Sequence, residues 1–144
     1  MLKDQPDDVI RGYFEHVQRV YDEASRVHGP ESLEAAVARF HDALEDGEMD
    51  LAELKTTLAR FFEEKPTQTV IDVILEACKV ITRHLDETYM QYIARVKKHP
   101  LARAVKIIDL RVNLYGSPTL PPGRLAERYL RALHELQNTS KITL

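Results

Sequence analysis

The sequence contains one cysteine, no tryptophan and no long run of apolar residues. A single cysteine excludes a disulfide within the chain, and Cys78 lies in the apolar run VIDVILEACKVI, where a buried thiol is expected rather than a reactive one. A membrane-spanning helix requires about 18 consecutive apolar residues, which no segment supplies, and no signal-peptide pattern opens the chain. We therefore expect a soluble protein in a reducing compartment, the cytoplasm.

The sequence also lacks an excess of charge of one sign. Its 20 lysines and arginines are scattered among 23 aspartates and glutamates, which gives a net charge of -3. Proteins that bind nucleic acid or an anionic membrane carry a basic patch or stripe, and none is seen here. We therefore expect no nucleic-acid and no membrane partner.

Strand patterns are missing as well, because nearly every segment repeats at the helical period. A chain of 144 residues with 44% hydrophobic content suits one compact domain, residues 1–144, and we expect an all-α helical bundle. A tail from about residue 138 is expected to be frayed. The expected helices cover about residues 7–28, 31–46, 50–63, 69–85, 86–98, 100–115 and 121–137.

Three of these helices begin with a capping signal. Asp50 with Glu53 fits a capping box, in which each side chain accepts a hydrogen bond from a free backbone N–H near the other residue. Thr69 with Asp72 is a weaker version of the same pattern, and Asp86 fits the N-cap of the following helix.

The segment RFHDALEDGEMD places a histidine and three acids within six positions. On a continuous helix, His41 and Glu45 lie together on one flank of an apolar stripe, and Asp42 and Asp46 form the next row. Two nearby alanines indicate that another element closely approaches the face of Asp42. A carboxylate on such a face must be compensated, and a divalent cation is a strong compensator.

Asp109 interrupts the most apolar stretch of the C-terminal half, ARAVKIIDLRVNLY, and Asn113 follows one turn later on the same side. A buried acid needs a partner, and two interpretations stay open. Asp109 pairs with Arg103 or Lys106, or caps a neighbouring helix. Alternatively, it completes a metal shell begun by the His-Asp pair at positions 41 and 42, and Asn113 orients the site or its ligand.

The first predicted helix carries another histidine, His16. An isolated histidine on an amphipathic helix is usually an ordinary core or surface residue, so this position alone indicates little. The remaining histidines lie next to turns or among charges and are expected at the surface: His28, His84, His99 and His134.

The combined pattern of His16, the adjacent pair His41 and Asp42, and Asp109 resembles the H…HD…D order of HD-domain metal phosphohydrolases. HDALED is similar to the HDxxED motif of the hydrolase domain in RelA/SpoT-type enzymes, and YIARVKKHPLARAVKIIDLRVN is similar to their stretch leading into K-x-x-D-x-x-x-N. The resemblance covers about residues 12–136. It implies the HD-domain fold.

The resemblance implies four metal ligands, His16, His41, Asp42 and Asp109. Two nitrogens and two oxygens suit a first-row divalent ion and suit calcium poorly. Manganese is the usual metal of this branch, and other first-row ions remain alternatives.

The same resemblance gives roles to other residues. Glu45 and Asp46 match the acidic pair that positions and activates the attacking water, and Asn113 matches a position that supports the site and the nucleotide. From helix geometry, Lys106 shares a side with Asp109 whereas Arg111 points elsewhere, so Lys106 is the favoured phosphate-binding residue and Arg111 is the weaker candidate. In the segment before His16, family members carry a basic, Gly-rich lead-in, where this chain has only Arg11.

The implied activity is hydrolysis of the 3'-pyrophosphate of guanosine tetra- or pentaphosphate. Val17 stands where the family has a proline, a departure that bears on substrate specificity. The chain leaves no room for the family's nucleotide-synthesising domain, so we expect hydrolysis only. One alternative is an HD-domain phosphatase that acts on a nucleoside monophosphate or a phosphorylated dinucleotide. Another is a non-catalytic helical sensing or interaction module, and a homo-oligomer is left open.

Overall fold

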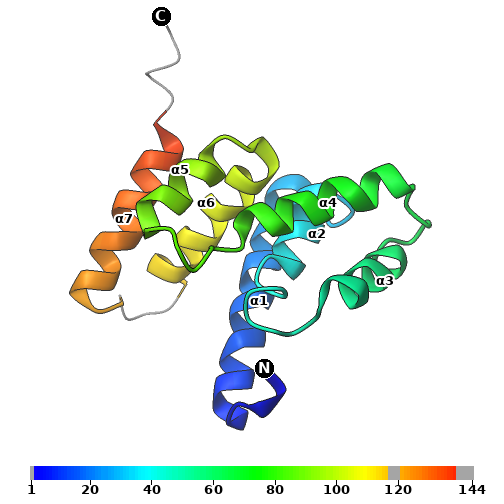
Figure 1. Ribbon diagram of the computed structural model, residues 1–144, viewed down its shortest axis with the longest axis horizontal. Coiled ribbons are helices and arrows are strands. Elements are labelled where there is room, and N and C mark those ends of the chain that lie inside the picture. Colours follow the sequence, from blue (N-terminus) through cyan, green and yellow to red (C-terminus); the bar gives the residue numbers. More distant parts are fainter. Residues whose placement is uncertain (1, 117–120, 139–144) are drawn as a thin grey trace, which may run out of the picture.

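The computed structural model describes residues 2–116 and 121–138 of the chain, and these residues form helices joined by short connections (Figure 1). The expected all-α fold is confirmed. A short 3-10 helix at Leu2–Asp4 precedes the α-helices. These are α1 (Asp7–His28), α2 (Leu33–Phe40), α3 (Leu51–Phe61), α4 (Gln68–Ile81), α5 (Tyr89–Lys97), α6 (Pro100–Tyr115) and α7 (Gly123–Gln137).

One of the predicted capping signals is confirmed and two are wrong. Asp50 and Glu53 form a complete capping box at the start of α3. Thr67, and not Thr69, is the N-cap of α4, where its side chain accepts the N–H of Val70. The backbone of Thr67 is extended, with φ of -70° and ψ of 161°, as an N-cap residue requires.

The start of α5 also differs from the prediction. Asp86 is not the N-cap, because Thr88 and Gln91 form a capping box two residues later. Helix α4 ends at Ile81 and not near residue 85, so residues 82–88 form a connecting loop. A helix end exposes unpaired carbonyl groups, and those at the end of α4 are taken up by a side chain of α5, described below.

The second predicted helix is shorter than expected, since α2 ends at Phe40. In a continuous helix the carbonyl of Ala38 would accept the N–H of Asp42, but here it accepts a hydrogen bond from the ring of His41. The chain continues through turns, and Gly47 has a φ of 74°, which favours glycine. Residues 41–48 are called the acidic turn below. The expected rows of helical side chains at 41, 42, 45 and 46 are therefore wrong.

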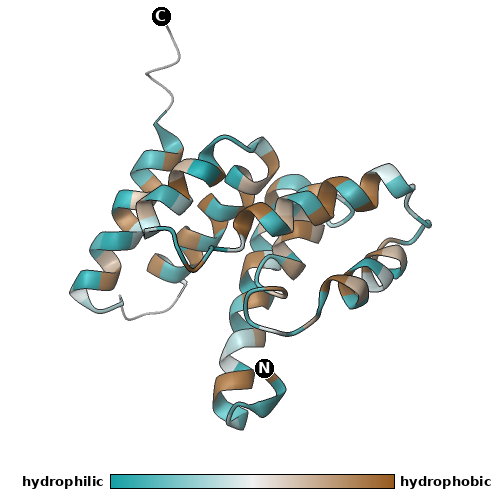
Figure 2. Ribbon diagram, in the orientation of Figure 1, coloured by the Kyte–Doolittle hydropathy of each residue, from teal (hydrophilic) through white to brown (hydrophobic). Residues whose placement is uncertain are grey.

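Helix α6 lies at the centre of the fold and packs against α1, α2, α4, α5 and α7. Along each helix, hydrophobic residues alternate with hydrophilic ones, so that apolar faces meet between neighbouring helices (Figure 2). Cys78 is fully buried within this core, as expected. The consequence for the site is that α1, α2 and α6 hold their facing residues in fixed positions.

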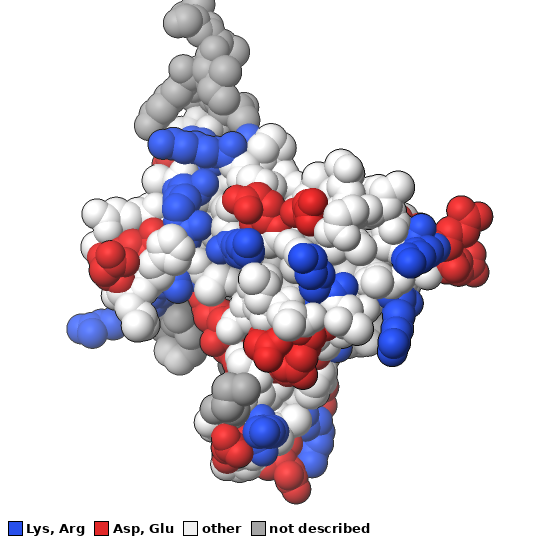
Figure 3. Space-filling model, turned by 45° about the vertical axis from the view of Figure 1, so that its right-hand side comes forward, with Lys and Arg blue, Asp and Glu red and all other residues white. Residues whose placement is uncertain are grey.

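The surface carries mixed charge. On the face shown in Figure 3, acidic and basic side chains are interspersed over the helices. None of the helices within residues 2–116 and 121–138 is both long and apolar enough to traverse a bilayer. The tail expected to be frayed, from residue 139 onward, lies outside the described residues.

Candidate metal centre

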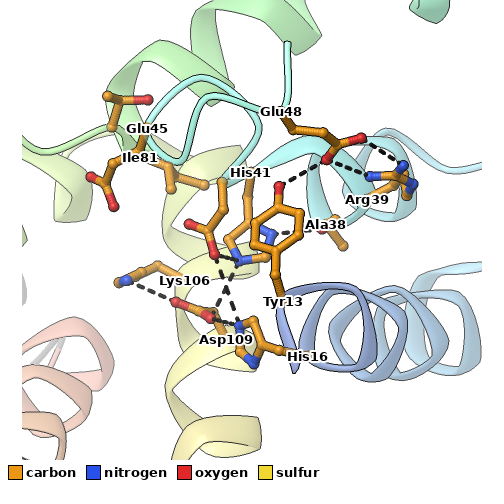
Figure 4. A network of polar contacts seen from close by, with 12 residues as sticks. Tyr13, His16, Ala38, Arg39, His41, Glu45, Glu48, Ile81, Lys106 and Asp109 are labelled. Atoms are coloured by element: carbon orange, nitrogen blue, oxygen red, sulfur yellow. Dashed lines mark hydrogen bonds and ion pairs between the residues drawn. The ribbon is translucent and has the colours of Figure 1, made fainter. Parts of the chain in front are cut away.

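Four side chains from three distant segments converge at the junction of α1, α2 and α6. His16 comes from the middle of α1, His41 and Asp42 follow α2 directly, and Asp109 comes from α6. One nitrogen or oxygen atom of each lies within 4.8 Å of the corresponding atom of every other. The four residues predicted as ligands therefore lie together. Figure 4 shows three of them, His16, His41 and Asp109, with their side chains pointing toward one another.

The distances within this cluster suit a single ion. Nε2 of His16 lies 2.8 Å from Oδ1 of Asp109 and 4.0 Å from Oδ2 of Asp42. Nε2 of His41 lies 3.0 Å from the same Asp42 oxygen and 3.3 Å from Oδ1 of Asp109. Ligands about 2.1 Å from one ion lie roughly 3 Å apart at right angles and roughly 4.2 Å apart when opposite. The four donors therefore fit a shared divalent cation.

The two ring nitrogens of His41 face different groups. Its Nδ1 lies 2.6 Å from the carbonyl oxygen of Ala38, to which it donates, so in the neutral ring Nε2 carries a lone pair. That Nε2 is fully buried and has no hydrogen-bond partner among the described residues, although it faces two carboxylates. A backbone carbonyl on one ring nitrogen and an ion on the other is the usual arrangement of a metal-ligating histidine.

The two flanking acids also favour a proton on His41. Burial alone would lower the pKa of the ring, but the charges of Asp42 and Asp109 outweigh burial and raise this pKa well above its usual value. The cluster is therefore compatible either with an imidazolium or with a metal ion. In both cases a positive charge is required between the two acids.

Asp109 is buried, and both of its carboxylate oxygens make polar contacts. Oδ2 accepts a hydrogen bond from Nζ of Lys106 at 2.7 Å, and Oδ1 faces the two histidines. Burial raises the pKa of Asp109, but Lys106 and His41 outweigh it and hold the pKa well below the usual range. The pairing with Lys106 agrees with the first interpretation of Asp109, and its place in the cluster keeps the metal interpretation open. Arg103 instead bonds the carbonyl of Leu136.

A cleft of about 580 Å³ opens beside the cluster. Its acidic lining residues belong to the acidic turn and α6, and α1 contributes Tyr13 and His16. Another part of the lining, called the basic and aromatic wall below, belongs to the 82–88 loop, α5 and α7. The lining side chains are Tyr13, His16, Asp42, Glu45, Asp46, Arg83, His84, Leu85, Tyr89, Tyr92, Lys106, Asp109, Asn113, Leu125, Arg128 and Tyr129.

Glu45 and Asp46 both line the cleft without belonging to the four-residue cluster. Oε1 of Glu45 accepts the backbone N–H of Arg83 at 2.8 Å, which fixes the carboxylate on the cleft wall. Asp46 lies at the exposed rim, where partial desolvation and the charges of Asp42 and Glu45 raise the pKa of its carboxyl to about 6. Asp46 can therefore gain or lose a proton close to neutral pH.

The far end of the acidic turn is anchored by Glu48. Its carboxylate accepts two hydrogen bonds from Arg39, at 2.9 and 3.2 Å, and one from the hydroxyl of Tyr13 at 2.8 Å (Figure 4). Burial and the contact with Glu48 raise the pKa of Tyr13, which stays a neutral donor. This network ties the turn to α1 and α2 on either side of His41.

The predicted substrate-binding residues occupy different positions. Asn113 lines the cleft, as does Lys106, whose ammonium is already paired with Asp109. Arg11 is exposed on α1 and is not among the lining residues. Arg111, the weaker candidate, is exposed and lines a separate groove between α1 and α6.

Sequence reasoning did not identify the basic and aromatic wall. The guanidinium of Arg128 lies 3.7 Å from the ring centre of Tyr89 on one side, and that of Arg83 lies 5.6 Å from the same ring. Neither guanidinium forms an ion pair with a carboxylate of the described residues. The remaining surface histidines are exposed or partly exposed as expected, although His84 also lines the cleft.

Comparisons of this chain with protein-family models, with curated proteins and with solved structures each found no significant match. The function is therefore inferred from the geometry of the cluster and the cleft, together with the motifs that supply their residues.

Proposed function

We propose that this protein is a metal-dependent phosphohydrolase of the HD-domain type. The observation that carries the proposal is the convergence of His16, His41, Asp42 and Asp109 within 4.8 Å, at the wall of a cleft that also holds two carboxylates outside the cluster. This separation of ion-binding groups from proton-transferring groups is what metal-assisted hydrolysis requires. The HDALED motif, which resembles that of RelA/SpoT-type hydrolases, supplies residues of both kinds.

The four clustered side chains would hold a first-row divalent ion, which their mixed nitrogen and oxygen donors suit. The resemblance to RelA/SpoT-type hydrolases favours Mn2+ among these ions. When bound, such an ion supplies Lewis acidity, which neutralises charge on the phosphate and makes a nearby water more acidic. Lys106 and the carbonyl of Ala38 support the shell from outside, by fixing Asp109 and His41.

Glu45 and Asp46 would handle the proton of the attacking water. The N–H of Arg83 occupies Oε1 of Glu45, which leaves Oε2 to accept a hydrogen bond from water in the cleft. Asp46, with a pKa of about 6, would exchange a proton with the reacting groups near neutral pH. Water attack on phosphorus then breaks the bond to the leaving oxygen, and the proton is returned to the product.

The favoured substrate is guanosine tetra- or pentaphosphate, cleaved at the 3' position with release of pyrophosphate. Two arginines without carboxylate partners among the described residues, Arg83 and Arg128, support binding of a phosphate-rich ligand. Tyrosine rings on the same wall offer surfaces for a base. Because Lys106 is engaged with Asp109, the two arginines would make the direct phosphate contacts, and Asn113 lines the same cleft.

A second candidate is favoured by one observation, the balance of charge inside the cluster. A protonated His41 and Lys106 can neutralise Asp42 and Asp109 with no ion present. The cleft would then belong to a non-catalytic module that binds a nucleotide or another anion.

Metal analysis of the purified protein, followed by a hydrolysis screen with Mn2+ over a nucleotide panel, tests the proposal. We expect about one equivalent of bound ion and release of pyrophosphate from guanosine 3'-diphosphate 5'-diphosphate, abolished by a chelator. Release of orthophosphate from nucleoside monophosphates alone would favour the nucleotidase alternative. Absence of both ion binding and hydrolysis would favour the non-catalytic module.

A further inference from the structure

Arg95 on α5 joins the end of α4 to the loop that follows it. Nη1 donates to the carbonyl of Val80 at 2.7 Å, and Nη2 donates to the carbonyl of Thr82 at 3.0 Å. The same guanidinium forms an ion pair with Glu87, with distances of 2.7 and 3.3 Å. One side chain thus caps two helix-end carbonyls and closes the 82–88 loop.

The carbonyl of Thr82 and the N–H of Arg83 belong to the same peptide group. A trans peptide is planar, so its C=O and N–H point in opposite directions, and fixing one fixes the other. The N–H of this peptide donates to Oε1 of Glu45 at 2.8 Å. The contact of Arg95 with Thr82 therefore sets the direction in which Arg83 meets the carboxylate.

We propose that Arg95 is a positioning residue for Glu45, acting through the Thr82–Arg83 peptide. The inference rests on the proposed function, since it is there that Glu45 activates water. A charged donor on the carbonyl also polarises the peptide, which strengthens its N–H as a donor. Arg95 thereby holds one oxygen of Glu45 and leaves the other directed to the cleft, although it is not itself among the residues that line the cleft.

Glu87 holds the 82–88 loop through two further contacts. Its carboxylate accepts the N–H of His84 at 2.9 Å in addition to the bonds from Arg95. The bonds from Arg95 and the one from His84 lower the pKa of Glu87 to about 2, so the carboxylate remains charged at neutral pH. The loop is therefore fixed on both sides of the Arg83 N–H that contacts Glu45. Arg95 holds the carbonyl of Thr82 before it, and Glu87 holds the N–H of His84 after it.

The first experiment measures amide hydrogen exchange at Arg83 by NMR in the metal-free protein. We expect Arg95→Ala to accelerate this exchange on the order of 10-fold, and Arg95→Lys to have a smaller effect because a single ammonium cannot span the same carbonyls. Arg103→Ala is the matched control, since Arg103 also donates to a helix-end carbonyl, that of Leu136. We expect it to change Arg83 exchange by less than about twofold.

The second experiment is a double-mutant cycle on Mn2+-dependent hydrolysis of guanosine 3'-diphosphate 5'-diphosphate. Arg95→Ala should lower kcat about 10-fold while KM and Mn2+ affinity change by less than about twofold. In a Glu45→Gln background the same substitution should cause almost no further loss, because the group that it positions is already disabled. A merely structural role of Arg95 would instead reduce kcat equally in both backgrounds.

The two experiments separate the inference from the proposed function. If the wild-type protein hydrolyses nothing, the proposed function fails, and Arg83 exchange alone decides whether Arg95 holds Glu45. Unchanged exchange at Arg83 in folded Arg95→Ala overturns the inference, as do multiplicative losses in the cycle. If Arg95→Ala does not fold, Arg95→Lys takes its place in both experiments, with the same direction of effect required.

Discussion

Helix α6 and the acidic turn, residues 41–48, bring groups to the same cluster in opposite ways. Asp109 sits on a regular helix, and its partner Lys106 is one turn earlier on the same face. The turn instead leaves the helical path after Phe40 and presents four polar side chains within six residues. A regular helix can present a neighbouring pair to one point, whereas a tight turn can direct several side chains into one cleft.

The two regions also differ in what holds them. Asp109 is fixed by the packing of α6 against the surrounding helices. The turn depends on a few hydrogen bonds. The ring of His41 donates to the carbonyl of Ala38, and the carboxylate of Glu48 accepts from Arg39 and Tyr13. Substitutions in α6 should therefore affect stability as well as ion binding, and substitutions in the turn should mainly affect function.

The largest effect is expected for Asp109→Ala. It removes a ligand and leaves the buried Lys106 ammonium unpaired, so Mn2+ affinity should fall more than about 100-fold and the free energy of unfolding by about 3–5 kcal/mol. Isothermal titration calorimetry and urea unfolding measure the two quantities. The double variant Asp109→Ala/Lys106→Met should recover stability but not ion binding. Retained Mn2+ affinity in Asp109→Ala would remove this residue from the ion site.

The next largest effect is a loss of kcat without a loss of Mn2+ affinity, which would distinguish the acids of the turn that are not ligands from those residues that are. Glu45→Gln and Asp46→Asn should lower kcat by a factor on the order of 100 while leaving the Mn2+ dissociation constant within about twofold of the wild type. His41→Ala, from the same turn, is the contrasting variant and should lose the ion. Equal loss of Mn2+ in all three variants would make Glu45 and Asp46 ligands.

A smaller effect concerns stability and pH in the metal-free protein. The folded-state pKa of Asp46, about 6, lies above its ordinary value of 3.8, so the folded state binds more protons between these values. Stability therefore decreases as pH rises through this window, and Asp46→Asn removes the decrease. We expect Asp46→Asn to be roughly 1–2 kcal/mol more stable than the wild type above pH 7, allowing for solvent screening, and equal to it near pH 4. A constant difference at all pH values in urea unfolding would contradict this assignment.

The smallest effects are expected for alanine substitutions of two glycines, one in the acidic turn and one in a helix. Gly47 in the turn has a φ of 74°, so Gly47→Ala should destabilise the protein by about 1 kcal/mol. Gly12 lies in α1, where an added Cβ meets nothing within 4 Å, so Gly12→Ala should stabilise by about 0.5–1 kcal/mol. Thermal or urea unfolding measures the change in unfolding free energy for each variant. If both variants are stabilised, the backbone at Gly47 tolerates a side chain and the prediction is wrong.

The same contrast explains what the sequence could predict. The all-helical fold, the burial of Cys78 and the shared side of Lys106 and Asp109 follow from helical periodicity and local spacing, and all three agree with the structure. The end of α2 at Phe40 depends on a side chain of His41 replacing a backbone donor, which no periodic pattern encodes. The predicted convergence of the cluster came from motif order, while its geometry arose from tertiary packing.

The basic and aromatic wall of the cleft could not be predicted for a related reason. Arg83 lies in a loop and Arg128 on α7, and they approach each other only through Tyr89 on α5. Nothing in their sequence surroundings distinguishes them from arginines elsewhere that are paired with acids. Their lack of a carboxylate partner is visible only when the described residues are seen in three dimensions.

The buried Cys78 gives the molecule a chemical reporter of its own unfolding. Burial, with a contribution from Asp42, raises the pKa of this thiol to about 12, so the reactive thiolate is essentially absent from the folded state at neutral pH. Thiol reagents can modify the chain only when α4 separates from the core. Because the chain has no other cysteine, this single labelling reaction reports opening of the core around α4 alone, and its rate equals the opening rate when labelling is faster than reclosing.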